Sequence, residues 1–421
     1  MERFHINIFD LLLCLSKAQD LVNNSLADHQ QQVAYLALRI AEEMNMSNQQ
    51  RKKVFFAALI HDIGALSSNE RLDIVDNEDN PSIHSHGFKG AALLCDYPYL
   101  HQEAMIIKYH HVPWDSGNGR LYKDENVPYE SHIIHLADRV VSKIKNKQNI
   151  LTQIPNIMKD IENQKGMIYE DRIVEALQRL SRKEYIWLDV TSINPIAKVA
   201  KIGEYDALAL DIDEVIQLSH IFSRVIDFRS RFTAKHSAGV AVTAENLAKL
   251  VNFSQIECKM MLVAGFLHDL GKLAIKNSVL EKPEKLNTEE FDQMRSHTYY
   301  TYQLLGMLPG FDAIKTWASY HHEKLNGNGY PFHIQGDNLT LGARIMAVAD
   351  IFTAISENRP YRVGMSDNKV IKTLNGMVSH NSIDAYVVKL LIDNYDMINN
   401  ARIVAQTRAG EAYDDFLCSY S

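Results

Sequence analysis

The sequence predicts an all-α fold of two similar helical bundles in tandem, joined by a helical connector. Three observations support this prediction. Apolar residues recur at the helical period of 3.6 over residues 29–44 and again over residues 236–251. Alternating patterns long enough for a β-strand are absent. The two halves also repeat one series of polar residues, which indicates a tandem duplication.

The first twenty residues predict the opening helix of a folded domain. Their short apolar run is flanked by acidic Glu2 and Asp10, whereas a secretory signal begins with basic residues and ends in a small-residue cleavage site. No segment approaches the roughly 18 consecutive apolar residues of a membrane-spanning helix. We therefore expect a cytoplasmic protein that does not enter the membrane.

Composition excludes some classes of site. The four cysteines are scattered without a CxxC pair, which argues against a disulfide framework and against a cysteine zinc site. The formal net charge of −8 gives no support for binding polymeric nucleic acid, which requires a basic face. A small anionic substrate stays open, because the local charge of a cleft matters more than the total.

The duplication is read from matched spacings. The first series is His29, His61, Asp62, His86, His110, His111 and Asp138; the second is His236, His268, Asp269, His297, His321, His322 and Asp350. In both, 32 positions separate the first two histidines, and 24 separate the third from the fourth. The final aspartate follows the histidine pair by 27 positions in one series and 28 in the other. The repeats lie near residues 20–145 and 220–400.

Residues 146–215 predict the connector. Segments 153–162 and 170–180 have helical periodicity, and Pro155 and Pro195 interrupt the run. Because the composition is not rich in glycine and serine, a packed connector is favoured over a flexible linker.

The polar residues of the second repeat predict a pair of metal ions. Asp350 lies within the apolar run MAVADIFTAI, and His268–Asp269 follow VAGFL. An unpaired buried carboxylate is costly, so these side chains require a cation. Imidazole and carboxylate ligands without thiolate suit Fe, Mn, Co, Ni or Zn. Because no Walker A loop or nucleophile elbow is present, hydrolysis by a metal-activated hydroxide is the favoured reaction.

Three motifs in order, HDLGK (268–272), HHEKLNGNGYP (321–331) and RPYR (359–362), carry a family resemblance. Over about residues 230–365 the chain resembles the HD-GYP branch of the HD superfamily of phosphohydrolases. The resemblance implies two tandem HD-type bundles and hydrolysis of a 3′,3′-cyclic dinucleotide to a linear dinucleotide. It also implies two divalent ions, Fe or Mn, with Ni, Co or Zn as alternatives. It leaves open cyclic di-GMP against cyclic GMP-AMP, and further cleavage to mononucleotides.

The resemblance also assigns roles. It implies that His236, His268, Asp269 and Asp350 hold one ion, and that Asp269 bridges to a second ion held by His297, His321 and His322. Lys272 would face the scissile phosphate and assist the departing oxygen, so Asp269 and Lys272 are the expected catalytic pair. Tyr330 would contact the nucleotide, and Arg359 and Arg362 would bind phosphate or guanine, which suits the arginine fork.

Three positions depart from the family pattern. Phe232 stands where some members have a glutamate that holds a third metal, so we expect two ions. Thr353 stands where many have an aspartate, which puts hydrogen bonding behind the ligands in doubt. Thr301 replaces a usual glycine. None of the three is a metal ligand.

The first repeat keeps a candidate ligand at every matched position but has lost the substrate residues. Ala65 stands in the place of Lys272, GNGRL (117–121) replaces GNGYP, and KQNI (147–150) replaces RPYR. We expect a degenerate HD domain over 1–145 with a regulatory or structural role, a connector over 146–215 and a catalytic domain over 216–421. Whether the first repeat binds a metal stays open, and a homodimer is compatible with the sequence.

Two other functions compete with a cyclic-dinucleotide phosphodiesterase. One is a metal-containing receptor that senses the nucleotide without turnover and signals through the first repeat. The other is an HD hydrolase acting on dNTPs or guanosine tetraphosphate, against which the GYP and RPYR segments argue. The intact ligand series and Lys272 favour the phosphodiesterase.

Overall fold

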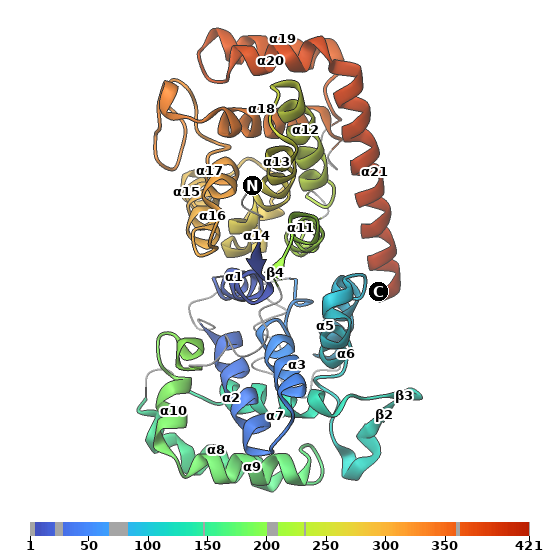
Figure 1. Ribbon diagram of the computed structural model, residues 1–421, viewed down its shortest axis with the longest axis vertical. Helices are drawn as coiled ribbons and strands as arrows, with labels where there is room; N and C mark the ends of the chain where they lie inside the picture. The colour runs from blue at the N-terminus through green and yellow to red at the C-terminus, as the bar shows by residue number, and fades with distance from the viewer. Residues whose placement is uncertain are drawn as a thin grey trace. The chain divides into compact units, whose positions relative to one another are not determined.

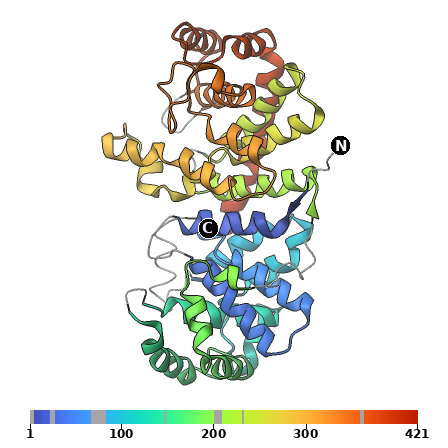
Figure 2. The ribbon, with the colours of Figure 1, turned by 60° about the vertical axis from the view of Figure 1, so that its left-hand side comes forward.

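The computed structural model describes residues 5–21, 28–66, 83–145, 148–199, 209–230, 233–358 and 363–420. Helices dominate this part of the chain, and its strands form two short antiparallel pairs, so the predicted all-α class is confirmed. Contacts divide the chain into two compact units (Figures 1 and 2). The N-terminal unit comprises Leu15–Leu208, and the C-terminal unit comprises Met1–Cys14 with Ala209–Ser419.

The C-terminal unit is a bundle in which α12 (His236–Leu250) packs against α13 (Gln255–Leu267) and α18 (Leu341–Ser356). The strand β1 (Ile6–Asn7) pairs antiparallel with β4 (Ala209–Leu210). The other elements are α11 (Ile212–Asp227), the 3-10 helix η6 (Leu270–Ala274), α14 (Asn277–Leu280), α15 (Thr288–Arg295), α16 (His297–Leu305), α17 (Asp312–Ser319), η7 (Gly336–Asn338), α19 (Asp367–Ser379), α20 (Ala385–Asp393) and α21 (Tyr395–Tyr420).

The N-terminal unit repeats this core: α2 (His29–Glu43) packs against α3 (Asn48–Leu59) and α7 (Tyr129–Ser142). The remaining elements are α5 (Ile83–Leu94), η2 (Pro98–Leu100), α6 (His101–Lys108), η3 (Asp115–Arg120), the β2–β3 pair (Leu121–Tyr122, Glu125–Asn126), α8 (Ile150–Asn163), α9 (Asp171–Ser181), α10 (Glu184–Val190) and η4 (Pro195–Lys198). Helix α1 (Ile8–Asp20) contains the division at Cys14.

The contact-based division differs from the boundaries drawn from the sequence in two places. Residues up to Cys14 group with the C-terminal unit, because β1 pairs with β4. The predicted connector groups largely with the N-terminal unit, because α9 packs on α2 and α7. The functional boundaries at residues 145 and 215 therefore remain a proposal.

Local sequence signals place the helices that carry the site. Helix α12 covers 236–250 against the predicted 236–251, and its buried face includes Val240, Ala244 and Leu247. Helix α13 begins at a capping box in which the Ser254 hydroxyl and the Glu257 carboxylate each bind the other residue's backbone amide. This cap fixes the start of the helix, whose far end delivers His268 and Asp269.

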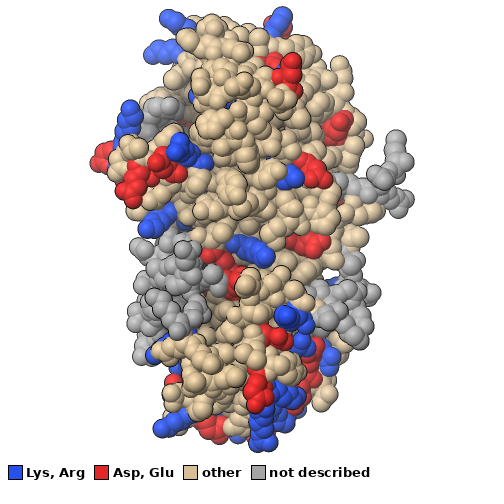
Figure 3. Space-filling model, turned by 90° about the vertical axis from the view of Figure 1, so that its left-hand side faces the viewer, with Lys and Arg blue, Asp and Glu red and all other residues tan. Residues whose placement is uncertain are grey.

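One face of the molecule carries surface charges of both signs (Figure 3). On the face shown in Figure 3, lysine and arginine side chains are interspersed with aspartate and glutamate. No helix among the described residues is long and apolar enough to cross a bilayer. No disulfide joins the four cysteines, Cys14, Cys95, Cys258 and Cys418, all of which lie in the described part of the chain.

Candidate metal centre and active site

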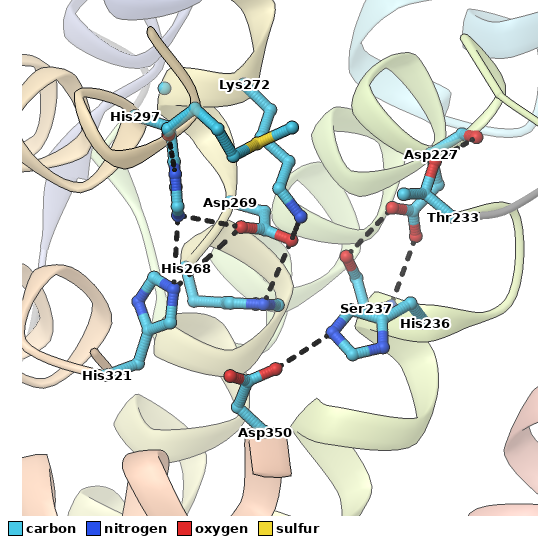
Figure 4. A network of polar contacts seen from close by, with 12 residues as sticks. Asp227, Thr233, His236, Ser237, His268, Asp269, Lys272, His297, His321 and Asp350 are labelled. Atoms are coloured by element: carbon cyan, nitrogen blue, oxygen red, sulfur yellow. Dashed lines mark hydrogen bonds and ion pairs between the residues drawn. The ribbon is translucent and has the colours of Figure 1, made fainter. Parts of the chain in front are cut away.

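The C-terminal unit brings all seven predicted ligands of the second series together, and Figure 4 shows six of them. His236 begins α12, His268 and Asp269 follow α13, and Asp350 lies within α18. Nε2 of His236 is 3.0 Å from Oδ1 of Asp350, and Nε2 of His268 is 3.2 Å from Oδ2 of Asp269.

The remaining three histidines complete the cluster. Nε2 of His297 is 3.4 Å from Oδ1 of Asp269 and 3.3 Å from Nε2 of His321. Nδ1 of His322 is 3.8 Å from Oδ2 of Asp350. His322 is half-buried and the other six side chains are buried, so the cluster lies in the interior with one side toward solvent.

Backbone hydrogen bonds orient three of these rings. The Nδ1 atoms of His268, His297 and His321 lie 2.7, 2.6 and 2.6 Å from the carbonyl oxygens of Gly265, Met294 and Ala318. Each carbonyl belongs to the residue three positions earlier, so the local helical turn holds the ring. A carbonyl only accepts, so Nδ1 carries the hydrogen and the lone pair of Nε2 faces the cluster.

The donor atoms fit metal ions. Within the described chain, Nε2 of His268 and Oδ1 of Asp269 are buried without a hydrogen-bond partner. Buried polar atoms are almost always paired, so converging orphan acceptors indicate a cation. Three groups have ligand atoms within 4.8 Å of one another: His236–His268–Asp350, His268–Asp269–His321 and His297–His321–His322. The residues present can therefore hold metal ions.

The electrostatics favour a cation as well. Burial opposes ionisation of Asp269, but His268 and Lys272 outweigh it and hold the pKa of Asp269 well below its usual range. Burial lowers the pKa of His297 to about 3, so this ring is neutral at pH 7, the form that binds metal. For His236 burial is outweighed by the Glu357 and Asp350 carboxylates, which raise its pKa to about 10. Metal binding at His236 must therefore displace a proton.

A chain of polar contacts behind His236 was not foreseen from the sequence. Nδ1 of His236 is 3.3 Å from Oε1 of Glu357, and Nε2 of Gln406 donates to Oε2 of Glu357 at 2.9 Å. Arg402 donates in turn to Gln406. These buried residues link α21 to a candidate ligand, and a carboxylate behind a ligating histidine fixes its orientation and basicity. The one sequence signal was a glutamate two helical turns after Asp350.

Lys272 lies at the edge of the cluster. Its Nζ donates to Oδ2 of Asp269 at 2.6 Å, and 18% of its side chain is exposed. Buried Arg229 holds the turn that carries Lys272, because its guanidinium donates to the carbonyls of Lys272 and Ile275 at 2.7 and 2.9 Å. The predicted catalytic lysine thus meets both the metal cluster and solvent.

The Gly-Tyr-Pro loop is tied to the histidine pair. The buried carboxylate of Glu323 accepts from the backbone amides of Phe332 and Ile334 at 2.6 and 3.1 Å. The Tyr330 amide donates to the His322 carbonyl at 3.2 Å. The Tyr330 ring lies 4.9 Å from that of His322. Burial and the carboxylates of Asp350 and Asp269 raise the pKa of Tyr330, so its hydroxyl is a donor at neutral pH.

Two family departures have structural compensation. Thr301 accepts from the Gly271 amide at 2.9 Å and donates to the His268 carbonyl at 3.1 Å, so it joins α16 to the turn after α13. Thr353 is buried against α12 near Gly239, and Glu357 supplies the carboxylate behind His236. The remaining predictions, on Phe232, Arg359 and Arg362, fall outside the described residues.

The N-terminal unit also gathers its series. Nε2 of His29 is 3.1 Å from Oδ1 of Asp138, Nε2 of His61 is 3.4 Å from Oδ2 of Asp62, and Nε2 of His86 is 3.2 Å from Oδ1 of Asp62. His110 and His111 complete a buried triad with His86. Ala65 is fully buried where the C-terminal unit has Lys272.

Comparison with known proteins places both units in one family. The HD domain family matches the chain twice, over residues 26–142 and 220–387. The 3′3′-cGAMP-specific phosphodiesterase 1 of Vibrio cholerae is 30% identical over 399 residues, which cover 93% of this chain and 92% of the relative. The chain belongs to the HD-GYP family. The motifs predicted this family correctly.

Two other relatives of this HD-GYP protein match, respectively, most of the chain and about a third of it. The 3′3′-cGAMP-specific phosphodiesterase 3 of V. cholerae is 26% identical, covering 89% of this chain and 92% of the relative. The cyclic di-GMP phosphodiesterase response regulator RpfG of Xanthomonas campestris is 37% identical over 142 residues, 33% of this chain and 38% of its own. A crystal structure of the V. cholerae cyclic GMP-AMP phosphodiesterase V-cGAP3 shares the fold, with a TM-score of 0.65 at 22% identity over 93% of this chain and 98% of that one.

Proposed function

We propose that the C-terminal unit is a metal-dependent phosphodiesterase that opens a 3′,3′-cyclic dinucleotide to a linear dinucleotide. One observation carries the proposal: seven imidazole and carboxylate side chains converge with two orphan acceptors, and Lys272 lies at their edge. The relatives that match about nine-tenths of the chain are named as phosphodiesterases, which supports the same reaction.

The proposed assignment puts one ion on His236, His268, Asp269 and Asp350. A second ion would share Asp269 and bind His297, His321 and His322. Iron or manganese is the proposed pair, and Ni, Co and Zn suit the same donor set. When bound, such a pair supplies Lewis acidity that activates water and offsets the charge of a phosphodiester.

The chain's own residues then bind the substrate and move its protons. Lys272 holds a proton on Nζ at the exposed edge, where it can bind a phosphoryl oxygen and protonate the departing ribose oxygen. Tyr330 presents a protonated hydroxyl beside His322 and can donate to the nucleotide. Glu323 fixes the loop that carries Tyr330, so the tyrosine is positioned before substrate arrives. Arg359 and Arg362 remain the proposed phosphate or guanine contacts.

For the substrate we propose 3′,3′-cyclic GMP-AMP in preference to cyclic di-GMP. The relatives that match over nine-tenths of the chain are named for cGAMP, and both contain a region equivalent to each unit here. The relatives named for cyclic di-GMP match about a third of the chain. The matches over about nine-tenths of the chain therefore support 3′,3′-cyclic GMP-AMP.

The test is anaerobic purification with metal analysis, followed by chromatographic assay of both cyclic dinucleotides. We expect about two ions in the C-terminal unit and faster cleavage of 3′,3′-cyclic GMP-AMP. Asp269→Ala should lose metal and turnover together, because it removes the shared ligand. Tight binding of the nucleotide by metal-loaded protein without cleavage would refute the enzyme and support a receptor, and cleavage that persists in Asp269→Ala would refute the site.

A further inference from the structure

The histidine triad of the N-terminal unit is already arranged like the ligands of one ion. Nε2 of His86 lies 3.1 Å from Nε2 of His110, 3.2 Å from Nε2 of His111 and 3.2 Å from Oδ1 of Asp62. All four side chains are buried. Ligand atoms at about 2.0–2.1 Å from a tetrahedral ion lie roughly 3.3 Å apart. The three separations measured from Nε2 of His86 are close to this value, and the ligand atoms of the three histidines lie within 4.8 Å of one another.

The backbone fixes the tautomer of one ring in this cluster. Nδ1 of His110 lies 2.7 Å from the Ile107 carbonyl, so Nδ1 carries the hydrogen and Nε2 presents a lone pair. Oδ1 of Asp62 is buried and has no hydrogen-bond partner among the described residues. The lone pair of His110 and the unpartnered oxygen of Asp62 both suit a cation.

The other half of this cluster differs from its C-terminal counterpart. Arg139 is buried, with 2% exposed, and contacts Oδ2 of Asp138 through two nitrogens at 2.8 and 3.2 Å. The residue after the matching aspartate, Asp350, is Ile351, which carries no charge. Positive charge next to Asp138 disfavours a divalent ion on His29, His61 and Asp138.

The buried charges of the two clusters differ accordingly. Apart from histidines, the N-terminal cluster contains two carboxylates and one guanidinium, a net charge of −1. The C-terminal cluster contains the carboxylates of Asp269, Asp350 and Glu357 against Lys272, a net charge of −2. The N-terminal cluster can therefore neutralise less positive charge from bound metal ions than the C-terminal cluster can.

From this arrangement we infer that the N-terminal unit binds a single divalent transition-metal ion through Asp62, His86, His110 and His111. Arg139 supplies, at Asp138, the positive charge that a second ion supplies in the C-terminal unit. Three imidazoles and one carboxylate suit a tetrahedral ion such as Zn²⁺. With Ala65 in place of the lysine, this ion stabilises the unit and takes no part in the proposed hydrolysis, so the inference stands apart from the substrate.

The test counts ions in the full chain. Chelator-stripped protein is reloaded with Zn²⁺, desalted and analysed by mass spectrometry for metal per chain. We expect three ions in wild type, two in Asp62→Asn and one in Asp269→Asn. Arg139→Ile, which installs the residue of the matching position, should raise the count to four. Unchanged metal in Asp62→Asn, or four ions in wild type, overturns the inference.

A second measurement tests the inference if the Asp62 variant does not fold. In the Asp269→Asn chain the C-terminal centre is disabled, so a rise in the thermal midpoint on adding Zn²⁺ must come from the N-terminal unit. We expect a saturable rise with a stoichiometry of one. No rise in this background overturns the inference even if every Asp62 variant fails to fold.

Discussion

Histidine orientation at the centre depends on residues that never touch the reacting atoms. His268, His297 and His321 use backbone carbonyls, whereas His236 uses the Glu357 carboxylate, which Gln406 holds from α21. A carboxylate partner makes a ligating imidazole more basic than a carbonyl does. His236 is therefore the ligand whose affinity for metal depends most on its surroundings.

Glu357→Gln should weaken metal binding while leaving all seven ligands in place. The neutral amide of glutamine lacks the negative charge that makes His236 a stronger metal ligand. Partners of this kind contribute about 10- to 100-fold in metal affinity. Competition with a fluorescent chelator measures the change. Glu284→Gln, an exposed change in the same unit, is the matched control and should bind metal as wild type does. Equal affinities for the two variants would show that the contact is incidental.

Lys272→Ala should separate chemistry from metal binding. If Nζ protonates the departing oxygen, kcat falls by about 10²-fold or more, while the metal content stays at the wild-type level. Single-turnover assays with metal analysis on the same samples measure both quantities. An unchanged kcat would remove Lys272 from the mechanism.

Burial of His220, which is not among the proposed metal ligands, predicts that the stability of the fold depends on pH. Burial, with the nearby Arg224, lowers its pKa to about 4 beside the ring of Phe266, 5.1 Å away. The folded chain then binds fewer protons than the unfolded chain between about pH 6.5 and 4. This contribution to stability is complete above pH 6.5 and is lost as the pH falls through 4.

His220→Phe removes that dependence, because phenylalanine does not titrate. Between pH 7 and pH 4.5, metal-free wild type should lose on the order of 2 kcal/mol more unfolding free energy than the variant. Urea titrations at both pH values measure the difference. Parallel losses in the two proteins would contradict a neutral His220.

Residue by residue, the sequence predicted the clustered polar side chains better than the residues that support them. Seven polar positions in apolar helices were predictable, because a buried charge needs a reason. Glu357, Gln406 and Arg229 were not, because only tertiary packing brings them behind the site, and their own neighbourhoods look like ordinary helix ends. The metal roles themselves remain proposals.

At the scale of elements, the turn after each His–Asp pair packs directly on the next ligand helix. A Cβ on Gly271 would lie 2.0 Å from the His297 carbonyl oxygen, and one on Gly64 would lie 2.0 Å from the His86 carbonyl oxygen. The close approach brings the aspartate of each pair beside the third histidine of its series in both units. Helix periodicity predicted the helices to within a residue or two, but not this contact between them.

Gly271→Ala should therefore destabilise the fold, because the backbone atoms it meets cannot yield without moving α16. Overpacking of this kind costs about 1–3 kcal/mol. Denaturant unfolding measures it, with Gly376→Ala in α19 as the control, since nothing lies within 4 Å of that Cβ. The control should be neutral or stabilising by about 0.5–1 kcal/mol. Equal stabilities for the two variants would contradict the close packing.

At the scale of the whole molecule, duplication was the most reliable inference from sequence, because two series of matched spacings do not arise by chance. The helical class followed from the period of the apolar residues. The boundaries of the units could not be predicted from the sequence. They depend on the pairing of β1 with β4, which lie some 200 positions apart, and no local sequence pattern indicates this pairing. One fold thus holds two clusters that differ in buried charge.

The charge of the whole chain gives one more prediction. With a net charge of −8 and interspersed surface charges, the protein should not retain double-stranded DNA even at low salt. Fluorescence anisotropy with a labelled duplex measures this. Binding that weakens steeply as salt is added would instead indicate a basic face.

The contact between Gln406 and Glu357 has a practical consequence for anyone who trims the gene. The HD domain match ends at residue 387, and a chain cut there keeps every proposed ligand and Lys272. It loses the final helix and with it the hydrogen bond that holds Glu357 against His236. If a shortened chain loses its metal on a desalting column, the loss would result from the truncation. It would not measure the metal affinity of the intact protein.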